Sequence, residues 1–181
     1  MRQVWQLWEA ALPPQQCNQL IALCQAECTM QDGTTFNQVD SNSVNTIRDT
    51  RIGWTNNEAI KEIVDYYYKE ANRNAFSFDA NYIPAVQYGE YAEGNFYGWH
   101  HDINWQADCP YDRKLSVVIQ LTDPREYTGG QFQFKHVESP TGFLSQGSVL
   151  VFPSYLEHQV TRVESGLRRS LVAWVEGPRW R

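Results

Sequence analysis

Apolar and polar residues alternate with a period of two through most of the second half of the chain. The alternating runs are short, and Gly, Pro, Asp and Ser residues separate them, which is typical of half-buried β-strands joined by turns. Many short strands in succession predict a sandwich or a barrel. The runs are YIPAVQY, NFYGWHH, KLSVVIQL, GQFQFK, SVLVF, HQVTRV and RRSLVAWV.

The first part of the chain has mainly a helical period. VWQLW alternates as a short strand does, and Pro13-Pro14 then opens a helical segment. Asn56 or Asn57 can cap a second helix that runs to about Asn74. We predict that both helices pack against one outer face of the β structure. The apolar residues at helical spacing are Leu20, Ile21, Cys24 and Cys28 in the first helix, and Ile60, Ile63, Val64 and Tyr67 in the second.

The polar segments between these runs predict loops. Residues 31–46 are rich in Asp, Gly, Thr, Asn and Ser, and the segments 31–51 and 103–112 are long enough to cover the mouth of a barrel and shape its specificity. Gly129-Gly130 and Gly147 are expected to permit tight turns. No repeat or linker divides the chain. We therefore expect one domain over residues 1–181, with helical support over about 1–80 and a β core over about 81–178.

Charge and composition limit the partners. The chain has a formal net charge of -6 at pH 7, which disfavours nucleic acid because no concentrated basic patch offsets it. No apolar run reaches the roughly 20 residues that cross a bilayer, and the first residues lack the pattern of a signal peptide, so we expect a cytoplasmic protein without a membrane partner. Cys17, Cys24 and Cys28 lie near one face of the predicted first helix and form no CxxC pair, and we interpret them as reduced thiols in the core.

The candidate chemistry begins with an HxD triplet. His100 and Asp102 are two residues apart in a predicted strand, so their side chains leave the same face while His101 points away. His158 begins the run HQVTRV and supplies a third ligand. Two histidines and one carboxylate leave half of an octahedral ion open, which suits iron(II) with a bidentate co-substrate and dioxygen. HxD alone is weak support, because the triplet arises by chance in many sequences.

An arginine adds to this set. Arg168 lies ten positions after His158 on the next predicted strand, where a guanidinium can clamp the distal carboxylate of 2-oxoglutarate. The adjacent Arg169 is the alternative, because alternation in a strand lets only one of the two face inward.

These residues belong to a longer pattern that covers roughly residues 84–176. This region resembles the prolyl 4-hydroxylase-like branch of the iron(II)- and 2-oxoglutarate-dependent oxygenases, whereas the first 80 residues match only in having bracing helices. The motif residues of the first half are Tyr91, Gly94, Tyr97, His100 and Asp102. Those of the second half are Gly129, Gly130, Gly147, Phe152, Pro153, Ser154, His158, Gly166, Arg168 and Trp174.

The resemblance implies a mainly β fold, a double-stranded β-helix or jelly-roll barrel, with the metal near its open mouth. It implies iron(II), 2-oxoglutarate and dioxygen, with ascorbate as a further candidate cofactor, and hydroxylation of a substrate C–H bond coupled to decarboxylation of 2-oxoglutarate. Gln120 stands where some relatives carry a tyrosine, which leaves the second donor to the distal carboxylate open. The implied metal ligands are His100, Asp102 and His158, and the implied co-substrate residues are Arg168, Tyr91, Tyr97, Gln120 and Trp174.

The sequence leaves three functions open. The first is a prolyl hydroxylase acting on a peptide or protein, and the second is the same chemistry on a free amino acid or other small metabolite. The third is a cupin-like barrel that binds metal or sugar without oxidation, which Arg168 disfavours because such a protein does not need it. The oligomeric state is not indicated. We interpret His101 and His136 as non-ligands, place His101, Trp99 and Trp105 near the pocket rim, and suggest that Arg48 and Arg51 engage an acidic group.

Overall fold

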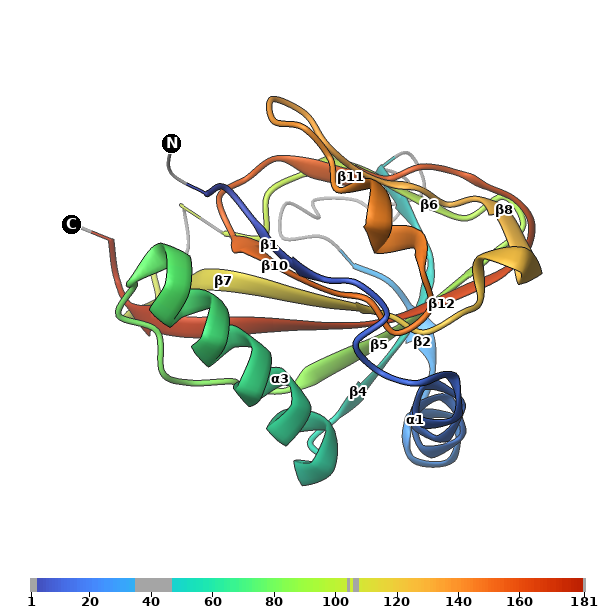
Figure 1. Cartoon of the computed structure of the whole chain (residues 1–181), viewed down its shortest axis with the longest axis horizontal. Helices are drawn as coiled ribbons and strands as arrows, with labels where there is room; N and C mark the ends of the chain where they lie inside the picture. The colour runs from blue at the N-terminus through green and yellow to red at the C-terminus, as the bar shows by residue number, and fades with distance from the viewer. Residues whose placement is uncertain (1–2, 35–46, 104, 106–107, 181) are drawn as a thin grey trace.

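Two antiparallel β-sheets face each other, as the computed structural model of the chain shows for residues 3–34, 47–103, 105 and 108–180 (Figure 1). This arrangement confirms the predicted jelly roll. The larger sheet has the order β1 (Gln6–Trp8), β10 (Val149–Pro153), β7 (Tyr111–Gln120), β12 (Val163–Pro178), β5 (Val86–Ala92), β4 (Arg51–Thr55) and β2 (Gln31–Asp32), with β8 (Tyr127–Gly129) added on β12. The smaller sheet has the order β3 (Arg48–Asp49), β6 (Phe96–His100), β11 (His158–Val160) and β9 (Phe132–Phe134).

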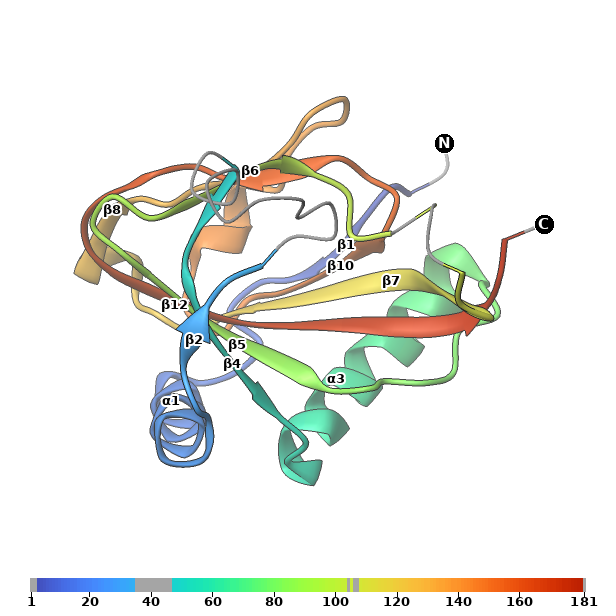
Figure 2. The ribbon, with the colours of Figure 1, turned by 180° about the vertical axis from the view of Figure 1, so that it is seen from behind.

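Both predicted helices form and cover the outer face of the larger sheet, opposite the smaller sheet (Figures 1 and 2). The first is α1 (Pro14–Glu27), and the second is α3 (Glu58–Ala71), which a π-helical turn extends over Asn72–Phe76. Asn57 caps α3, because its side chain accepts a hydrogen bond from the N–H of Ala59. Short 3-10 turns lie at Pro124–Glu126 and Thr141–Leu144. None of the helices in these described ranges combines the length and apolarity needed to cross a bilayer.

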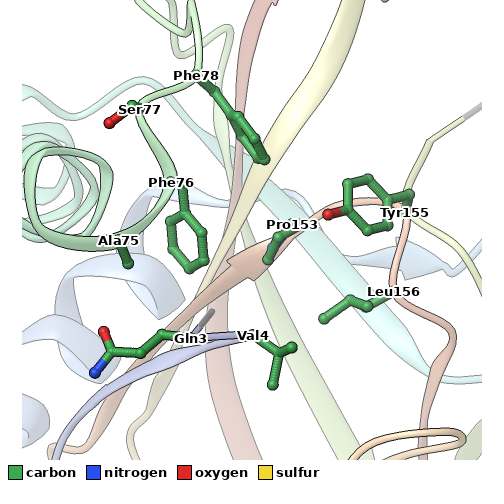
Figure 3. Close-up of a pocket in the computed structure, with 9 residues that line it drawn as sticks. All are labelled: Gln3, Val4, Ala75, Phe76, Ser77, Phe78, Pro153, Tyr155 and Leu156. Atoms are coloured by element: carbon green, nitrogen blue, oxygen red, sulfur yellow. The ribbon is translucent and has the colours of Figure 1, made fainter. Parts of the chain in front are cut away.

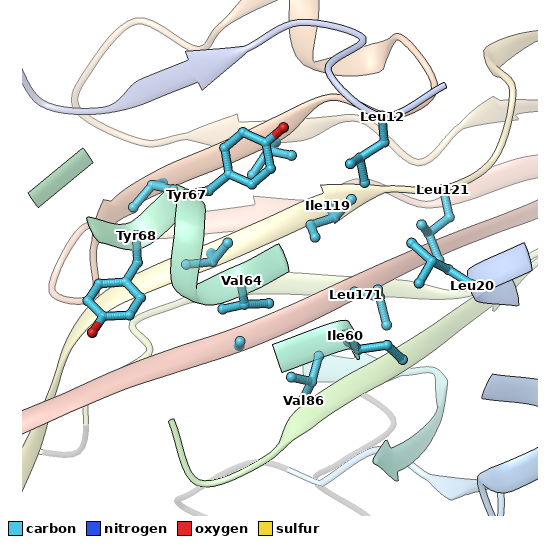
Figure 4. Close-up of a cluster of buried hydrophobic side chains, with 14 of the residues drawn as sticks. Leu12, Leu20, Ile60, Val64, Tyr67, Tyr68, Val86, Ile119, Leu121 and Leu171 are labelled. Carbon is cyan, nitrogen blue, oxygen red and sulfur yellow. The ribbon is translucent and has the colours of Figure 1, made fainter. Parts of the chain in front are cut away.

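Strand alternation divides the larger sheet into two faces. On β12, Leu171, Ala173 and Val175 belong to the cluster that packs under the helices. Figure 4 shows part of this cluster, with Ile60 and Val64 of α3 beside strand residues. The intervening residues of β12 point between the sheets, where the polar site lies. These inward residues are Arg168, Ser170, Val172 and Trp174.

Cysteines contribute to the helix-covered core. Cys17 and Cys24 are fully buried on α1, and both thiols are free. Burial raises the pKa of Cys17 to about 11, and burial together with Cys28 and Glu27 raises the pKa of Cys24 to about 12. These thiols stay protonated at neutral pH. Cys28 is not inside the helix as predicted, because α1 ends one residue earlier and Cys28 forms its C-cap.

The prediction of a loop over residues 31–51 is wrong in part. Its described residues include the short strands β2 and β3, and β4 follows at once, whereas residues 35–46 lie outside the described part. Gly53 lets β4 approach the end of α1, because a Cβ on Gly53 would lie 2.5 Å from the Cβ of Cys28. This strand is short and contains glycine and polar residues, so its alternation is weak.

Two predicted strands have different bounds. YIPAVQY forms a strand only from Val86 onward, because Pro84 has no N–H to donate and Tyr82 makes a single isolated bridge. HQVTRV divides between β11 and the start of β12. The predicted tight turns are confirmed, since Gly129, Gly130 and Gly147 have φ of 70°, 58° and 82°.

Candidate metal centre

Three side chains converge between the sheets. His100 ends β6 and His158 begins β11, and the two residues lie directly opposite each other in the smaller sheet. Asp102 follows β6, with Oδ1 3.6 Å from His100 Nε2 and Oδ2 3.5 Å from His158 Nε2. One ligand atom from each lies within 4.8 Å of the others, and within the described ranges no second trio of His, Cys, Asp or Glu side chains does so.

Backbone carbonyls orient both imidazoles. Nδ1 of His100 lies 2.7 Å from the carbonyl oxygen of Gly98, and Nδ1 of His158 lies 2.8 Å from that of Leu156. A carbonyl can only accept, so each Nδ1 carries the proton and each Nε2 presents its lone pair to the centre. This is the usual preparation of a histidine ligand.

Asp102 is held by hydrogen bonds to two serines, and these serines also contact each other. Its N–H donates to the carbonyl of Ser154 over 3.0 Å, and the Ser116 hydroxyl donates to its Oδ2 over 2.6 Å. Ser154 Oγ lies 2.9 Å from Ser116 Oγ. The prediction that Asp102 stands in the strand with His100 is therefore wrong, because β6 ends at His100. These hydrogen bonds, and not strand alternation, turn the carboxylate toward the histidines.

The surroundings of His100 and Asp102 favour the protonation states that bind a metal, a neutral imidazole and an ionised carboxylate. Burial, and then the neighbouring His158, lowers the pKa of His100 to about 3, so its imidazole is neutral at physiological pH. Burial opposes ionisation of Asp102, but His158, His100, the Ser116 hydroxyl and Arg113 together hold its pKa below the ordinary value. The site therefore offers a neutral imidazole from His100 and a carboxylate from Asp102, beside His158.

Aromatic rings pack against both histidines. The Tyr97 ring lies flat on His100, with centroids 3.4 Å apart and planes at 6°. Phe132 lies against His158 with centroids 5.3 Å apart and planes at 26°. Such contacts hold the imidazoles in one orientation.

The three ligands open into a cavity of about 40 Å³ whose wall includes Tyr91, Tyr97, Arg168 and Trp174. Arg168 is only 2% exposed, its Nη1 has no hydrogen-bond partner, and its Cζ lies 5.3 Å from the centre of the Tyr91 ring. No ion pair to Arg168 occurs within the described residues. The cavity thus contains a buried cation that forms no ion pair with the residues that the structure describes.

Arg169 takes the opposite face of β12. Its Nε lies 3.3 Å from Glu90 Oε1, and its N–H donates to the Thr122 hydroxyl. Arg168 is consequently the arginine that faces the cavity.

Gln120 does not line this cavity. Its Nε2 donates to the carbonyl of Thr122 over 3.1 Å and to the Tyr127 hydroxyl over 3.0 Å. Tyr127 comes from β8, and its pairing with Gln120 could not be read from the alternation of β7. Trp174 does line the cavity, with Arg113 Cζ 3.8 Å from the centre of its ring.

The residues expected near the rim lie apart from this cavity. His101 is exposed, and its Nδ1 lies 3.0 Å from the Tyr155 carbonyl oxygen. His136 is 3.7 Å from Glu157, and Trp99 and Trp105 are exposed. None of these four residues belongs to the cavity wall or to the metal-ligand group.

Sequence reasoning missed Ser116 and Arg113. Ser116 is a polar residue in the apolar run KLSVVIQL, and its position on the inward face was a signal that could have found it. Arg113 donates from Nη1 to the carbonyl of Asp102 over 3.4 Å and stacks on Trp174. Both residues support the site through Asp102.

A larger hollow of about 440 Å³ lies beside the turn that follows β10 (Figure 3). Phe76, Phe78, Pro153, Tyr155 and Leu156 contribute most of its apolar wall. Among the described residues, no histidine, cysteine, carboxylate or basic side chain lines it. Despite its size, the hollow therefore offers neither a metal ligand of these types nor a cationic side chain.

The donor set fits a divalent transition metal. The Nε2 atom of each histidine lies 3.5 or 3.6 Å from the nearer oxygen of Asp102, and one atom from each of the three residues lies within 4.8 Å of the others, whereas adjacent ligands bound at about 2.1 Å are roughly 3 Å apart. Two imidazole nitrogens and one carboxylate oxygen, with an open cavity on the remaining side, form the arrangement that non-haem iron(II) oxygenases use. The fold and site define a jelly-roll protein with a 2-histidine-1-carboxylate group that can hold a metal ion.

Comparison with known proteins gives the family. Residues 86–176, half of the chain, match the 2OG-Fe(II) oxygenase superfamily, and the chain belongs to it. A PKHD-type hydroxylase of Prochlorococcus marinus is 32% identical over 95 residues, which are 52% of this chain and 42% of that protein. The match therefore spans less than half the length of this curated relative.

Solved structures confirm the double-stranded β-helix. A viral collagen prolyl hydroxylase from Paramecium Bursaria Chlorella virus-1, in complex with 2OG, superposes with a TM-score of 0.75 at 18% identity over 97% of each chain. A prolyl hydroxylase from Trichoplax adhaerens, in complex with a hypoxia inducible factor peptide fragment, gives a TM-score of 0.72 at 18% identity, over 95% of this chain and 83% of that one. At this identity the likeness concerns the fold.

Proposed function

We propose that the protein is an iron(II)- and 2-oxoglutarate-dependent hydroxylase. The observation that carries the proposal is Arg168, which is 2% exposed and lacks an ion-pair partner among the described residues, in the same cavity as His100, Asp102 and His158. Burying a charge without a counter-charge is costly. The distal carboxylate of 2-oxoglutarate supplies that counter-charge in a geometry that a guanidinium can clamp.

The residues divide into binding roles under this proposal. His100, Asp102 and His158 hold the metal, and Arg168 fixes the co-substrate. Tyr91, Tyr97 and Trp174 form walls that orient the co-substrate and limit access of water, whereas Gln120 acts indirectly by holding Tyr127. When bound, iron(II) and 2-oxoglutarate supply the coupled reaction in which dioxygen and 2-oxoglutarate give succinate, carbon dioxide and a hydroxylated substrate.

For the substrate we propose a prolyl residue. The support is the family, together with structural neighbours that are themselves named prolyl hydroxylases. Ascorbate is proposed as an accessory cofactor on the same basis. A cupin-like barrel without oxidative chemistry accounts less well for the site, because binding a metal alone does not require the buried Arg168.

The test is anaerobic addition of iron(II) and 2-oxoglutarate. We expect the weak visible charge-transfer band of the chelate, followed by succinate when air is admitted. Asp102→Ala should lose iron, whereas Arg168→Ala should keep iron and bind 2-oxoglutarate poorly. A parent protein without the band, or two variants that behave as the parent does, would contradict the proposal.

A further inference from the structure

A second arginine lies buried beside the metal centre. Arg48 on β3 is 5% exposed and is paired through the backbone with Tyr97 of β6. Its Cζ lies 4.4 Å from the centre of the Tyr97 ring, the same ring that stacks on His100. Arg48 is therefore close to the reaction centre and is separated from bulk solvent.

Among the described residues, the Arg48 guanidinium donates three hydrogen bonds, all to neutral acceptors. Nε donates to Thr50 Oγ1 over 2.9 Å, Nη1 to the Thr34 carbonyl over 2.9 Å, and Nη2 to Gln87 Oε1 over 2.8 Å. In the described part of the chain no acidic side chain forms an ion pair with it. A guanidinium has five N–H donors, so two remain for a ligand.

Arg48 lies where two hollows meet. The cavity that contains the metal ligands adjoins a hollow of about 130 Å³, and Arg48 lines both. The second hollow adds Thr34, Trp54 and Arg113 to the shared wall. Arg168 lines the first hollow but not the second, so under the proposed function the second hollow is left for the substrate. The shared wall consists of Arg48, Gln87, Tyr97, Asp102 and Trp174.

The balance of charge leaves Arg48 unmatched. Arg48, Arg113 and Arg168 line the two hollows, and Asp102 is the one carboxylate among the described residues of these walls. Under the proposed function, the carboxylate of 2-oxoglutarate next to the keto group and the Asp102 carboxylate together balance the two charges of iron(II), and the distal carboxylate of 2-oxoglutarate balances Arg168. Arg113 is engaged by Asp102 and Trp174 and lies near Glu176. The bound co-substrate therefore leaves Arg48 without a counter-charge from the part of the chain that the structure describes.

We infer that the substrate presents a carboxylate to Arg48. This inference rests on the proposed function and narrows its substrate class. A carboxylate can take the two free N–H donors in a charge-assisted contact, whereas a neutral amide would leave the buried charge uncompensated. The carboxylate belongs to a free amino acid, to the C-terminal residue of a peptide, or to an acidic side chain next to the hydroxylated residue.

Pairs of acids and amides test the inference by direct binding. Calorimetric titration of protein loaded with manganese(II) and 2-oxoglutarate would compare L-proline with L-prolinamide, N-acetyl-L-proline with its amide, and an internal Pro-Asp peptide with its Pro-Asn counterpart. The pair with the largest acid preference identifies the source of the carboxylate. We expect at least one acid to bind about 30-fold or more tightly than its amide partner, since a buried charge pair contributes on that scale.

Variants locate the effect. Arg48→Gln should reduce the acid preference to near unity, and Arg48→Lys should keep part of it because the charge remains. Arg51→Gln is the matched control, since Arg51 is exposed on the neighbouring strand and lies 3.9 Å from Asp32, and it should keep the full preference. If Arg48→Gln fails to fold, the Arg48→Lys variant replaces it in the test. A complete loss of the acid preference in Arg48→Lys would count against the inference.

Two results would overturn the inference. One is a parent protein in which no acid binds more tightly than its amide, and the other is an Arg48→Gln variant with the parent's preference. In either case, a retained charge-transfer band with iron(II) and 2-oxoglutarate would leave the proposed function standing. Absence of that band in the parent would instead overturn the proposed function.

Discussion

The hydroxyl of Ser116 donates to Oδ2 of Asp102 over 2.6 Å, and both residues are buried. This bond aligns the carboxylate whose other oxygen, Oδ1, lies 3.6 Å from His100 Nε2. Because Ser116 stands on β7 and Asp102 follows β6, the bond also connects the two sheets at the metal centre. An outer partner of this kind sets the orientation and charge of a metal ligand.

Ser116→Ala should weaken metal binding by about 10- to 100-fold, since that is the usual loss when a ligand's hydrogen-bond partner is removed. Ser148→Ala is the control, because Ser148 is equally buried and bonds to Ala10 and Gly142, away from the site. Both variants lose a buried hydrogen bond worth about 1 kcal/mol. Titration with manganese(II) measures the difference, and equal metal affinities for the two variants would show that Ser116 has only a structural role.

Arg168→Gln and Arg169→Gln should separate co-substrate binding from stability. Arg168→Gln should raise the dissociation constant of 2-oxoglutarate by about 30-fold or more while iron binding persists, because it removes one partner of a buried charge pair. Arg169→Gln loses only the contact with Glu90 on the opposite face and should keep the parent affinity. Anaerobic titration of the chelate band gives both constants. A larger effect at Arg169 would contradict the assignment.

The β core could be predicted well because the two faces of a strand meet different surroundings. Apolar and polar residues therefore alternate along the strand with a period of two. That period also decides between the two arginines. Arg169 lies on the same face of β12 as Leu171, Ala173 and Val175, which the helices cover. Arg168 is an even number of positions from Trp174, so both side chains lie on the same face of β12 and face the cavity.

Features that depend on contacts between distant segments were not predictable in this way. Asp102 is oriented by Ser116 and Ser154, which follow it by 14 and 52 positions. Gln120 has the inward parity, but Tyr127 of β8 takes its amide and keeps it out of the cavity wall. Arg48 stands on a two-residue strand, which is too short to show any period. Such residues are found only when the strands are placed beside one another.

The low pKa of His100 predicts a loss of stability in mild acid for the metal-free protein. His100 titrates at about 3 in the fold and near 6.5 in an unfolded chain. The unfolded state thus binds more protons between these values, and stability falls as pH drops below about 6.5, by up to about 1.4 kcal/mol per pH unit. Above about 6.5 this contribution is fully present.

Urea unfolding in the presence of a chelator, between pH 7.5 and 4.5, measures this slope. Asp102 adds little there, because its contribution is lost only below its unfolded pKa of about 3.9. His100→Gln should flatten the curve, whereas His136→Gln, at an exposed position, should leave it unchanged. A parent curve that is flat from pH 6.5 to 4.5 would rule out the proposed cause.

Gly147 and Gly94 form a matched pair for the backbone. Both have positive φ, of 82° and 88° respectively, but a Cβ on Gly147 would lie 1.9 Å from the carbonyl oxygen of Leu12, whereas a Cβ on Gly94 would meet nothing within 4 Å. Gly94→Ala should therefore cost only the left-handed conformation, about 1 kcal/mol. Gly147→Ala must also move the backbone of Leu12, whose N–H donates to the Gly147 carbonyl over 3.1 Å.

We expect Gly147→Ala to lower the free energy of unfolding by about 3 kcal/mol or more, as large losses arise where strain and a backbone clash combine. For a chain of this size that corresponds to a fall in Tm of roughly 6 to 12 °C, against roughly 2 to 4 °C for Gly94→Ala. Thermal and urea unfolding of the two variants gives the comparison. Similar losses in both would mean that Leu12 moves freely, and that the turn before β10 does not fix the start of the chain against the larger sheet.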